Sequence, residues 1–219
     1  MNMMTVTRKI PEHQAVYERV RDMILLGMFS PGDALTIQGL ASRLEVGVTP
    51  VREAIRRLTA EQALETLGNR RVAVPEMTAG RLEEIYFLRM HVEPELTQRA
   101  AKNISTQQVA DLREIDRQID EAIALGDPEA YLERNNLFHF TIYRLAGSAI
   151  LFRTVQSLWV QAGPALRVVC GRYGTANLPD KHSTLMDALE RGDGPAAAQS
   201  LREDLEQGLD LVRESIRVD

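Results

Sequence analysis

The sequence has a single cysteine, few aromatic residues and no long apolar run. Cys170 alone cannot form an intramolecular disulfide, and such cysteine usage fits a reducing compartment. No stretch reaches the roughly 20 uninterrupted apolar residues that a membrane-spanning helix requires, and residues 1–11 lack the apolar segment of a signal peptide. We therefore expect a soluble, cytoplasmic protein with no membrane partner.

The sequence also lacks the commonest catalytic motifs. It contains no His-Glu-x-x-His pair, no nucleophile elbow and no phosphate-binding loop. We therefore expect no enzyme activity and no organic cofactor. Glycines and aromatics are few while Ala, Leu, Glu and Arg are many, a composition that favours helix.

A net charge of −5 would ordinarily argue against nucleic acid as a partner. The charge is divided unevenly, however, because residues 1–77 have a net charge of +1 and residues 78–219 one of −6. Several arginines cluster between residues 43 and 71. Local clustering matters more for DNA binding than total charge, so the first part of the chain stays a candidate.

The segment 49–64 predicts a helix with two different faces. Thr49 is expected to cap it and Pro50 to occupy its first position. Arg52 and Arg56 lie opposite an apolar stripe formed by Val51, Ala54, Ile55 and Leu58. A basic face beside free N–H groups suits phosphates or base edges. The alternative is a solvated basic face on a helix that only packs against a core.

The surrounding residues favour DNA recognition. Helical patterns cover residues 11–26 and the segment from Thr36, a predicted cap, to Leu44. After residue 64, two β-prone runs flank Gly68-Asn69, and Arg70 and Arg71 lie at the tip of the predicted hairpin. Three helices followed by a basic wing describe a winged helix-turn-helix domain that ends near residue 75.

Several motifs in this domain resemble the GntR family of bacterial transcription regulators: Ser-Pro-Gly-Asp-Ala-Leu (30–35), Leu-Ala (40–41) and Thr-Pro-Val-Arg-Glu-Ala-Ile-Arg-Arg-Leu (49–58). The resemblance covers roughly residues 16–74. Gly47-Val48 replaces a common Ser-Arg and Gln38 replaces a common arginine, which leaves the operator sequence open. With the basic helix face and wing tip, the candidate DNA-binding residues are Gln38, Gly47, Val48, Thr49, Arg52, Arg56, Gly68, Asn69 and Arg70.

From residue 77 onward only helical patterns occur. Stop and start signals divide them into helices near 78–102, 105–125, 127–146, 149–170, 177–191 and 195–217. Pro94 and Pro164 fall inside two of these segments, where we expect them to kink or interrupt the helix. The expected fold is therefore mainly α, with a winged helix-turn-helix domain at 1–76 and an all-helical bundle at 77–219.

The helical half resembles the FCD effector-binding domain of the FadR-type GntR regulators. The resemblance rests on Leu88-Arg89, Val92-Glu93-Pro94, residues 135–139, Lys181-His182 and the segments near 188–198. Many members bind a divalent metal in the bundle. The corresponding positions here are Asn135, His139, His182 and Asp204, which would suit zinc, nickel or manganese. Without the resemblance, His139 would be read as a core histidine and His182 as an ordinary first-turn residue.

The resemblance further implies an effector pocket. Arg89 would point inward and, with Arg167, His139 and His182, bind a small carboxylate. The alternative for Arg89 is an ion pair with Glu93, its i+4 neighbour.

We therefore expect a homodimeric regulator, a repressor of a palindromic operator, with the effector signal passing through the linker at Pro75. One alternative is a metal-dependent enzyme with Glu133 or Asp187 as base. Another is a regulator whose metal site has decayed.

Overall fold

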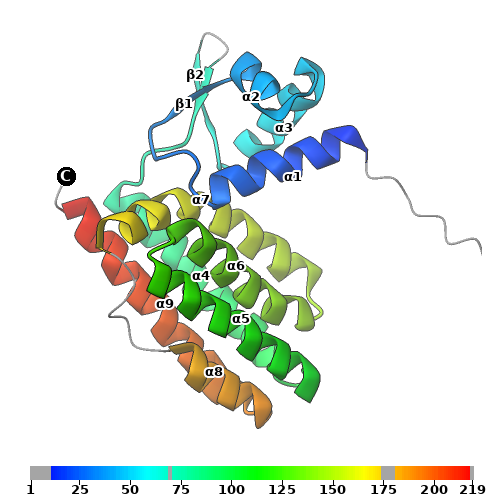
Figure 1. Ribbon diagram of the computed structural model, residues 1–219, viewed down its shortest axis with the longest axis vertical. Helices are drawn as coiled ribbons and strands as arrows, with labels where there is room; N and C mark the ends of the chain where they lie inside the picture. Colours follow the sequence, from blue (N-terminus) through cyan, green and yellow to red (C-terminus); the bar gives the residue numbers. More distant parts are fainter. Residues whose placement is uncertain (1–10, 69–70, 174–180, 218–219) are drawn as a thin grey trace, which may run out of the picture.

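The computed structural model describes residues 11–68, 71–173 and 181–217. A three-helix unit with a small sheet sits on one end of a bundle of long helices (Figure 1). The elements of the first unit are α1 (Glu12–Leu25), β1 (Ala34–Thr36), α2 (Ile37–Leu44), α3 (Val48–Ala60), β2 (Glu65–Gly68) and β3 (Arg71–Ala73). The bundle comprises α4 (Ala79–Ala100), α5 (Thr106–Leu125), α6 (Pro128–Leu145), α7 (Ala149–Tyr173), α8 (Lys181–Glu190) and α9 (Gly194–Arg217).

The predicted winged helix-turn-helix architecture is confirmed, with one strand that the sequence patterns did not indicate. The sheet is antiparallel in the order β1-β3-β2, so β3 pairs with the predicted partner β2 and also with β1. Leu35 lies opposite Val72 in the β1–β3 pair, and both side chains are buried. The strand β1 is only three residues long, and its pairing with distant β3 makes it a strand.

The start of α3 corrects a prediction. The helix begins at Val48, its N-cap is Gly47, and no side chain caps it. Thr49 and Pro50 therefore lie within the first turn. Pro50 fits there because the N–H groups of the first turn have no intrahelical carbonyl to bind. The predicted cap of α2 is confirmed, since the Thr36 hydroxyl accepts a hydrogen bond from the Gly39 N–H at 3.0 Å.

The bundle follows the predicted helix pattern closely. Side chains of Thr78, Ser105 and Asp127 cap α4, α5 and α6. The predicted start of the next-to-last helix, near Asn177, lies outside the described residues. Helices α4 and α7 continue through Pro94 and Pro164, so neither proline interrupts its helix; whether either kinks it stays a prediction. No helix in the described ranges is long and apolar enough to cross a membrane.

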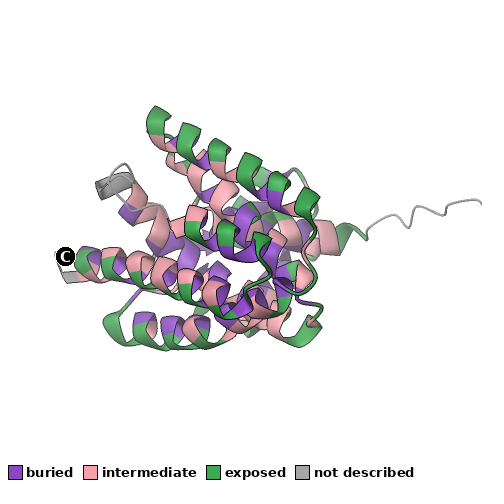
Figure 2. Ribbon diagram, turned by 90° about the horizontal axis from the view of Figure 1, so that it is seen from below, coloured by how far each residue is buried: buried purple, intermediate pink, exposed green. Residues whose placement is uncertain are grey.

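Buried residues line the inward faces of the bundle helices, as Figure 2 shows. The N-terminal unit has its own core, built on Val20, Leu58 and neighbouring apolar side chains. Val160 of α7 packs into that core although it belongs to the bundle. The two units therefore meet along α7, which lies against α1.

Candidate DNA-binding surface and metal centre

The residues predicted to contact DNA gather around the turn before α3. Gln38, Gly47, Val48, Thr49 and Arg52 are all exposed. Among the hydrogen bonds and ion pairs of the described ranges, none involves the Arg52 side chain. This leaves its guanidinium available to an outside anion.

The other predicted contacts are less uniform. Arg56 is exposed but forms an ion pair with Glu53 at 2.6 Å. Gly68 is exposed at the end of β2 with φ of 77°, a left-handed conformation that glycine adopts without strain. The predicted wing-tip residues Asn69 and Arg70 lie outside the described residues.

Arg57 does not join the basic face of α3. Its guanidinium lies 3.6 Å from the centre of the Tyr17 ring and donates to Gln14 of α1.

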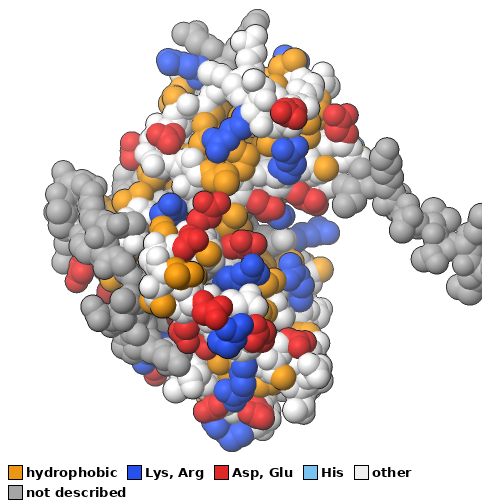
Figure 3. All heavy atoms as spheres, viewed as in Figure 1, with side chains coloured by type: hydrophobic (Ala, Val, Ile, Leu, Met, Phe, Trp, Pro, Cys, Tyr) orange, Lys and Arg blue, Asp and Glu red, His pale blue; other side chains and the backbone are white. Residues whose placement is uncertain are grey.

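Acidic and basic side chains alternate on the visible face of the bundle (Figure 3).

The bundle contains a partly open cavity of about 140 Å³. One part of its wall is apolar and aromatic, with Tyr86, Tyr131 and Trp159. The other part is polar and contains all four predicted metal ligands. Asn135, His139, His182 and Asp204 all line this cavity.

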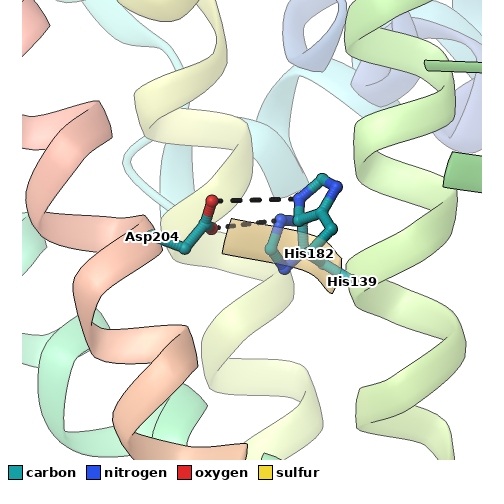
Figure 4. A group of neighbouring side chains, drawn as sticks. All are labelled: His139, His182 and Asp204. Carbon is teal, nitrogen blue, oxygen red and sulfur yellow. Dashed lines mark ion pairs between the residues drawn. The ribbon is translucent and has the colours of Figure 1, made fainter. Parts of the chain in front are cut away.

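Three of these side chains converge on one point (Figure 4). His139 Nε2 lies 3.5 Å from Asp204 Oδ2, and His182 Nε2 lies 3.8 Å from Asp204 Oδ1. One ligand atom from each residue lies within 4.8 Å of those of the other two. Helices α6, α8 and α9 each contribute one of the three.

Hydrogen bonds determine which nitrogen of each ring faces Asp204. The Tyr143 hydroxyl donates to Glu93 Oε2, so it accepts from His139 Nδ1, 3.3 Å away. On the other ring, His182 Nδ1 lies 2.7 Å from Asp116 Oδ1 and donates to it. Both Nε2 atoms of the neutral rings therefore direct a lone pair toward the Asp204 carboxylate.

Burial favours the neutral forms of His139 and Asp204, and of these only the neutral imidazole is a metal-ligating form. Burial lowers the pKa of His139 well below its ordinary value, and the nearby His182 and Arg89 act in the same direction. Burial raises the pKa of Asp204, while His182 and Arg89 oppose the increase. Lone pairs on two nitrogens and a carboxylate oxygen repel one another unless a cation or protons lie among them.

The donor set fits a divalent metal ion. Ligand atoms about 2.1 Å from a tetrahedral zinc ion lie about 3.4 Å from one another. The separations of 3.5 and 3.8 Å between Asp204 and the two rings are close to that spacing. Two imidazoles and a carboxylate, with the Asn135 carbonyl nearby, suit zinc, nickel or manganese.

Arg89 lies deep in the cavity wall, as the resemblance implied. It also forms the ion pair with Glu93 that was the alternative prediction. Its Nε donates to Glu93 Oε1 at 2.5 Å, and its guanidinium lies 4.6 Å from the centre of the Trp159 ring. Burial disfavours the charge of Arg89, but Glu93 and Tyr86 together raise its pKa above the ordinary value.

The structure does not bring Arg167 to the cavity. A Cβ atom added at Gly27 would lie 2.2 Å from the Arg167 Cβ, so this arginine packs against the end of α1. Its neighbours Leu166, Val169 and Cys170 line the cavity instead. The helical pattern of α7 does not reveal which face meets the N-terminal unit.

Sequence reasoning missed Asp116, the partner of His182. A signal was present, because Asp116 interrupts an apolar stripe between Leu112 and Ile119 on α5. Lys181 of α8 and Trp159 of α7 also line the cavity without having been predicted. Among the described residues of this wall, carboxylates outnumber cations: Asp116, Asp120 and Asp204 against Arg89 and Lys181.

A winged helix-turn-helix unit joined to a helical bundle with a polar cavity defines a class of protein, the DNA-binding regulators that carry a sensor domain. Comparisons agree. Residues 12–74 match the model for bacterial regulatory proteins of the gntR family, and residues 84–207 match the FCD domain. The chain belongs to the GntR family of transcriptional regulators and carries an FCD domain.

The chain is similar to the HTH-type transcriptional regulator McbR of Escherichia coli K12, with 29% identity over 196 residues, 88% of this chain and 89% of that protein. The solved structure of E. coli McbR/YncC superposes with a TM-score of 0.89 at 28% identity and covers 94% of this chain and 99% of that one. The HTH-type transcriptional repressor RspR of E. coli K12 is 23% identical over 208 residues, 93% of this chain and 90% of that protein. These relatives are regulators, and the enzyme alternative finds no support among them.

Proposed function

We propose that this regulator is a homodimeric repressor whose affinity for a palindromic operator is controlled by a small carboxylate bound beside a divalent metal ion. The metal centre consists of His139, His182 and Asp204, with Asn135 as a further oxygen ligand. The protein acts on DNA in the cytoplasm, and residues 1–76 and 77–219 divide the work of DNA binding and sensing.

One observation carries the metal assignment. One ligand atom each from His139, His182 and Asp204, on three different helices, lies within 4.8 Å of the other two. Asp116 and Tyr143 occupy the other nitrogen of each ring, so neither ring can donate to Asp204 without becoming protonated. A cation bound among them could be coordinated by all three at once.

The charges that line the cavity favour a carboxylate effector only when the metal ion is also bound. The described part of the cavity wall holds three carboxylates and two cations, and Glu93 already engages Arg89. An anion entering such a cavity would be repelled. A divalent ion offsets the excess and offers an open position to a ligand oxygen, while Lys181 and Arg89 supply cationic groups nearby.

For DNA we propose that the exposed residues at the start of α3, with Gln38 and Arg52, enter the major groove. The wing would contact the DNA beside that groove through Gly68, Asn69 and Arg70. Arg56 would bind the phosphates nearby. Two copies related by a two-fold axis would read two half-sites.

Calorimetric titration of metal-stripped protein with Zn²⁺, Ni²⁺ and Mn²⁺ tests the metal centre. We expect one ion per chain in the wild type and at least tenfold weaker binding in His139→Ala. His91→Ala is the matched control because His91 is exposed on α4. Equal metal affinity in the wild type and His139→Ala would remove the centre from the proposal.

Thermal-shift screening of small carboxylates against the metal-loaded protein then tests the effector class, because a ligand that binds only the folded state raises the unfolding temperature. Acids that stabilise the loaded protein should have no such effect on the stripped protein. Equal stabilisation of both forms would contradict a ligand held by the metal.

A further inference from the structure

Three side chains of the helical domain hold the C-terminal end of α3. Ser157 Oγ and Gln161 Nε2, both from α7, donate to the Glu61 carbonyl at 3.2 Å each. Arg81 of α4 donates to the Gln62 carbonyl at 2.7 Å. Arg81 also donates to Gln161 Oε1 at 2.7 Å, which ties the donors to one another.

These contacts act at a point where a helix needs external partners. The last carbonyls of a helix have no intrahelical N–H to accept from. Glu61 is the C-cap of α3, and Gln62 has φ of 60°, a conformation that is costly for a residue with a side chain. Donors from the helical domain therefore stabilise the bend that ends α3.

The same stretch of α7 also forms part of the cavity wall. The ring of Trp159 lies between Ser157 and Gln161 in sequence and lines the cavity, with its centre 5.1 Å from that of the His139 ring. The next residue, Val160, packs into the N-terminal core. The cavity contact and the α3 contacts thus lie within little more than one turn of helix.

The packing leaves little room to absorb a shift of α7. A Cβ atom added at Gly163 would lie 2.1 Å from the Leu25 carbonyl oxygen at the end of α1. The two helices therefore touch through backbone, which cannot change rotamer as a long side chain can. A displacement of this part of α7 would be passed to α1 and to the end of α3.

We infer that Arg81, Ser157 and Gln161 are positioning residues for the recognition helix α3. Cavity occupancy reaches DNA binding through residues 157–161 of α7 rather than through the linker at Pro75 alone. This inference rests on the proposed function for the source of the signal. The contacts of Arg81, Ser157 and Gln161 with the end of α3 affect DNA binding directly. They can therefore be tested without the effector.

Trp159 is the single tryptophan of the chain, so intrinsic emission reports on this part of α7. The probe is a DNA duplex selected from a random pool by the wild-type protein. We expect saturating duplex to change the emission of the wild type. In Ser157→Ala and Gln161→Leu most of that change should be lost, and the affinity for DNA should fall roughly three- to tenfold, as for a lost hydrogen bond.

Two further variants separate positioning from misfolding. Ser157→Thr keeps a hydroxyl donor and should retain the emission response, while Gln107→Leu alters an exposed glutamine on α5 and should behave as wild type. The inference is overturned if duplex leaves wild-type emission unchanged, or if Ser157→Ala and Gln161→Leu respond as fully as the wild type. A protein that binds no metal but keeps the DNA response would contradict the proposed function and leave this inference standing.

Discussion

The two domains each contain an arginine–glutamate ion pair within one helix, in opposite surroundings. Arg56 and Glu53 of α3 pair at 2.6 Å with side chains 74% and 39% exposed, whereas Arg89 and Glu93 of α4 pair at 2.5 Å with side chains 3% and 0% exposed. Water and salt screen the first pair, which can exchange partners for a phosphate at little cost. The second is held among Tyr86, Tyr143 and Trp159, where every charge must keep its partner.

This contrast extends to the whole of both sites. The proposed DNA-binding surface consists of exposed residues of α2, α3 and β2 and depends on an outside partner. The cavity is lined by groups from six helices, and its buried members, such as Arg89 and His139, depend on one another. Substitutions in the first should change binding with little effect on folding, and substitutions in the second should change both.

Removal of Glu93 should have the largest effect. Glu93→Ala leaves the Arg89 charge and the Tyr143 hydroxyl without their partner, and we expect a loss of about 3 to 5 kcal/mol in the stability of the helical domain. Urea unfolding followed by Trp159 emission measures it. Glu53→Ala should leave the unfolding midpoint unchanged within error, because its pair is exposed. Equal losses in the two variants would contradict the contrast.

The reactivity of a cysteine should also differ strongly between the cavity wall and the exposed turn before α3. Burial raises the pKa of Cys170 to about 11. Because the thiolate forms only as pH rises toward that value, alkylation by iodoacetamide at pH 8 should be about a hundredfold slower than for a free cysteine. Thr49→Cys in a Cys170→Ala background places a thiol on the exposed turn as the comparison. Equally fast alkylation of both would show that the cavity wall is open to solvent.

Arg52 should dominate DNA affinity. Arg52→Ala is expected to weaken binding by about 1 to 3 kcal/mol, the usual cost of one good base contact, without changing the unfolding midpoint. Arg56→Ala should cost less, because Arg56 must leave Glu53 before it binds a phosphate. Anisotropy titration measures both, with exposed Arg202→Ala on α9 as the control. Unchanged affinity in Arg52→Ala would remove Arg52 from the interface.

The smallest effect should come from Asp116, which touches the proposed metal centre only through His182. Asp116→Ala should weaken Zn²⁺ binding about tenfold, because His182 loses the acceptor that orients its ring. Asp116→Asn keeps an acceptor oxygen and should restore most of the affinity. Competition with a chelating dye gives the constants, and Asp111→Ala on the exposed face of α5 is the control. Wild-type affinity in Asp116→Ala would show that the ring needs no such support.

Most of the helices could be predicted because their signals are local. Caps at Thr36, Thr78, Ser105 and Asp127 act on N–H groups two or three residues away, so the sequence alone identifies them. The predicted start of α3 was wrong because threonine is a common N-cap residue, yet Gly47 and not Thr49 is the N-cap. The strand β1 escaped prediction because its partner β3 lies more than 30 residues away.

The candidate metal ligands were named from a resemblance in residue order, and their convergence depends on packing. Asn135 and His139 share a helix face by spacing alone, whereas His182, Asp204 and Asp116 approach through contacts among α5, α6, α8 and α9. Arg167 shows the opposite outcome, since its place on α7 put it against α1 rather than in the cavity.

The sequence by itself determined the mainly helical fold, the order of the two domains and the family, because periodicity, caps and motifs act over a few residues. Only the tertiary structure decided which ring nitrogens face Asp204, which arginine lies in the cavity, and that α7 joins the cavity wall to the end of the recognition helix. The physical reason is that such contacts join residues far apart in the chain. They arise only when whole helices have packed.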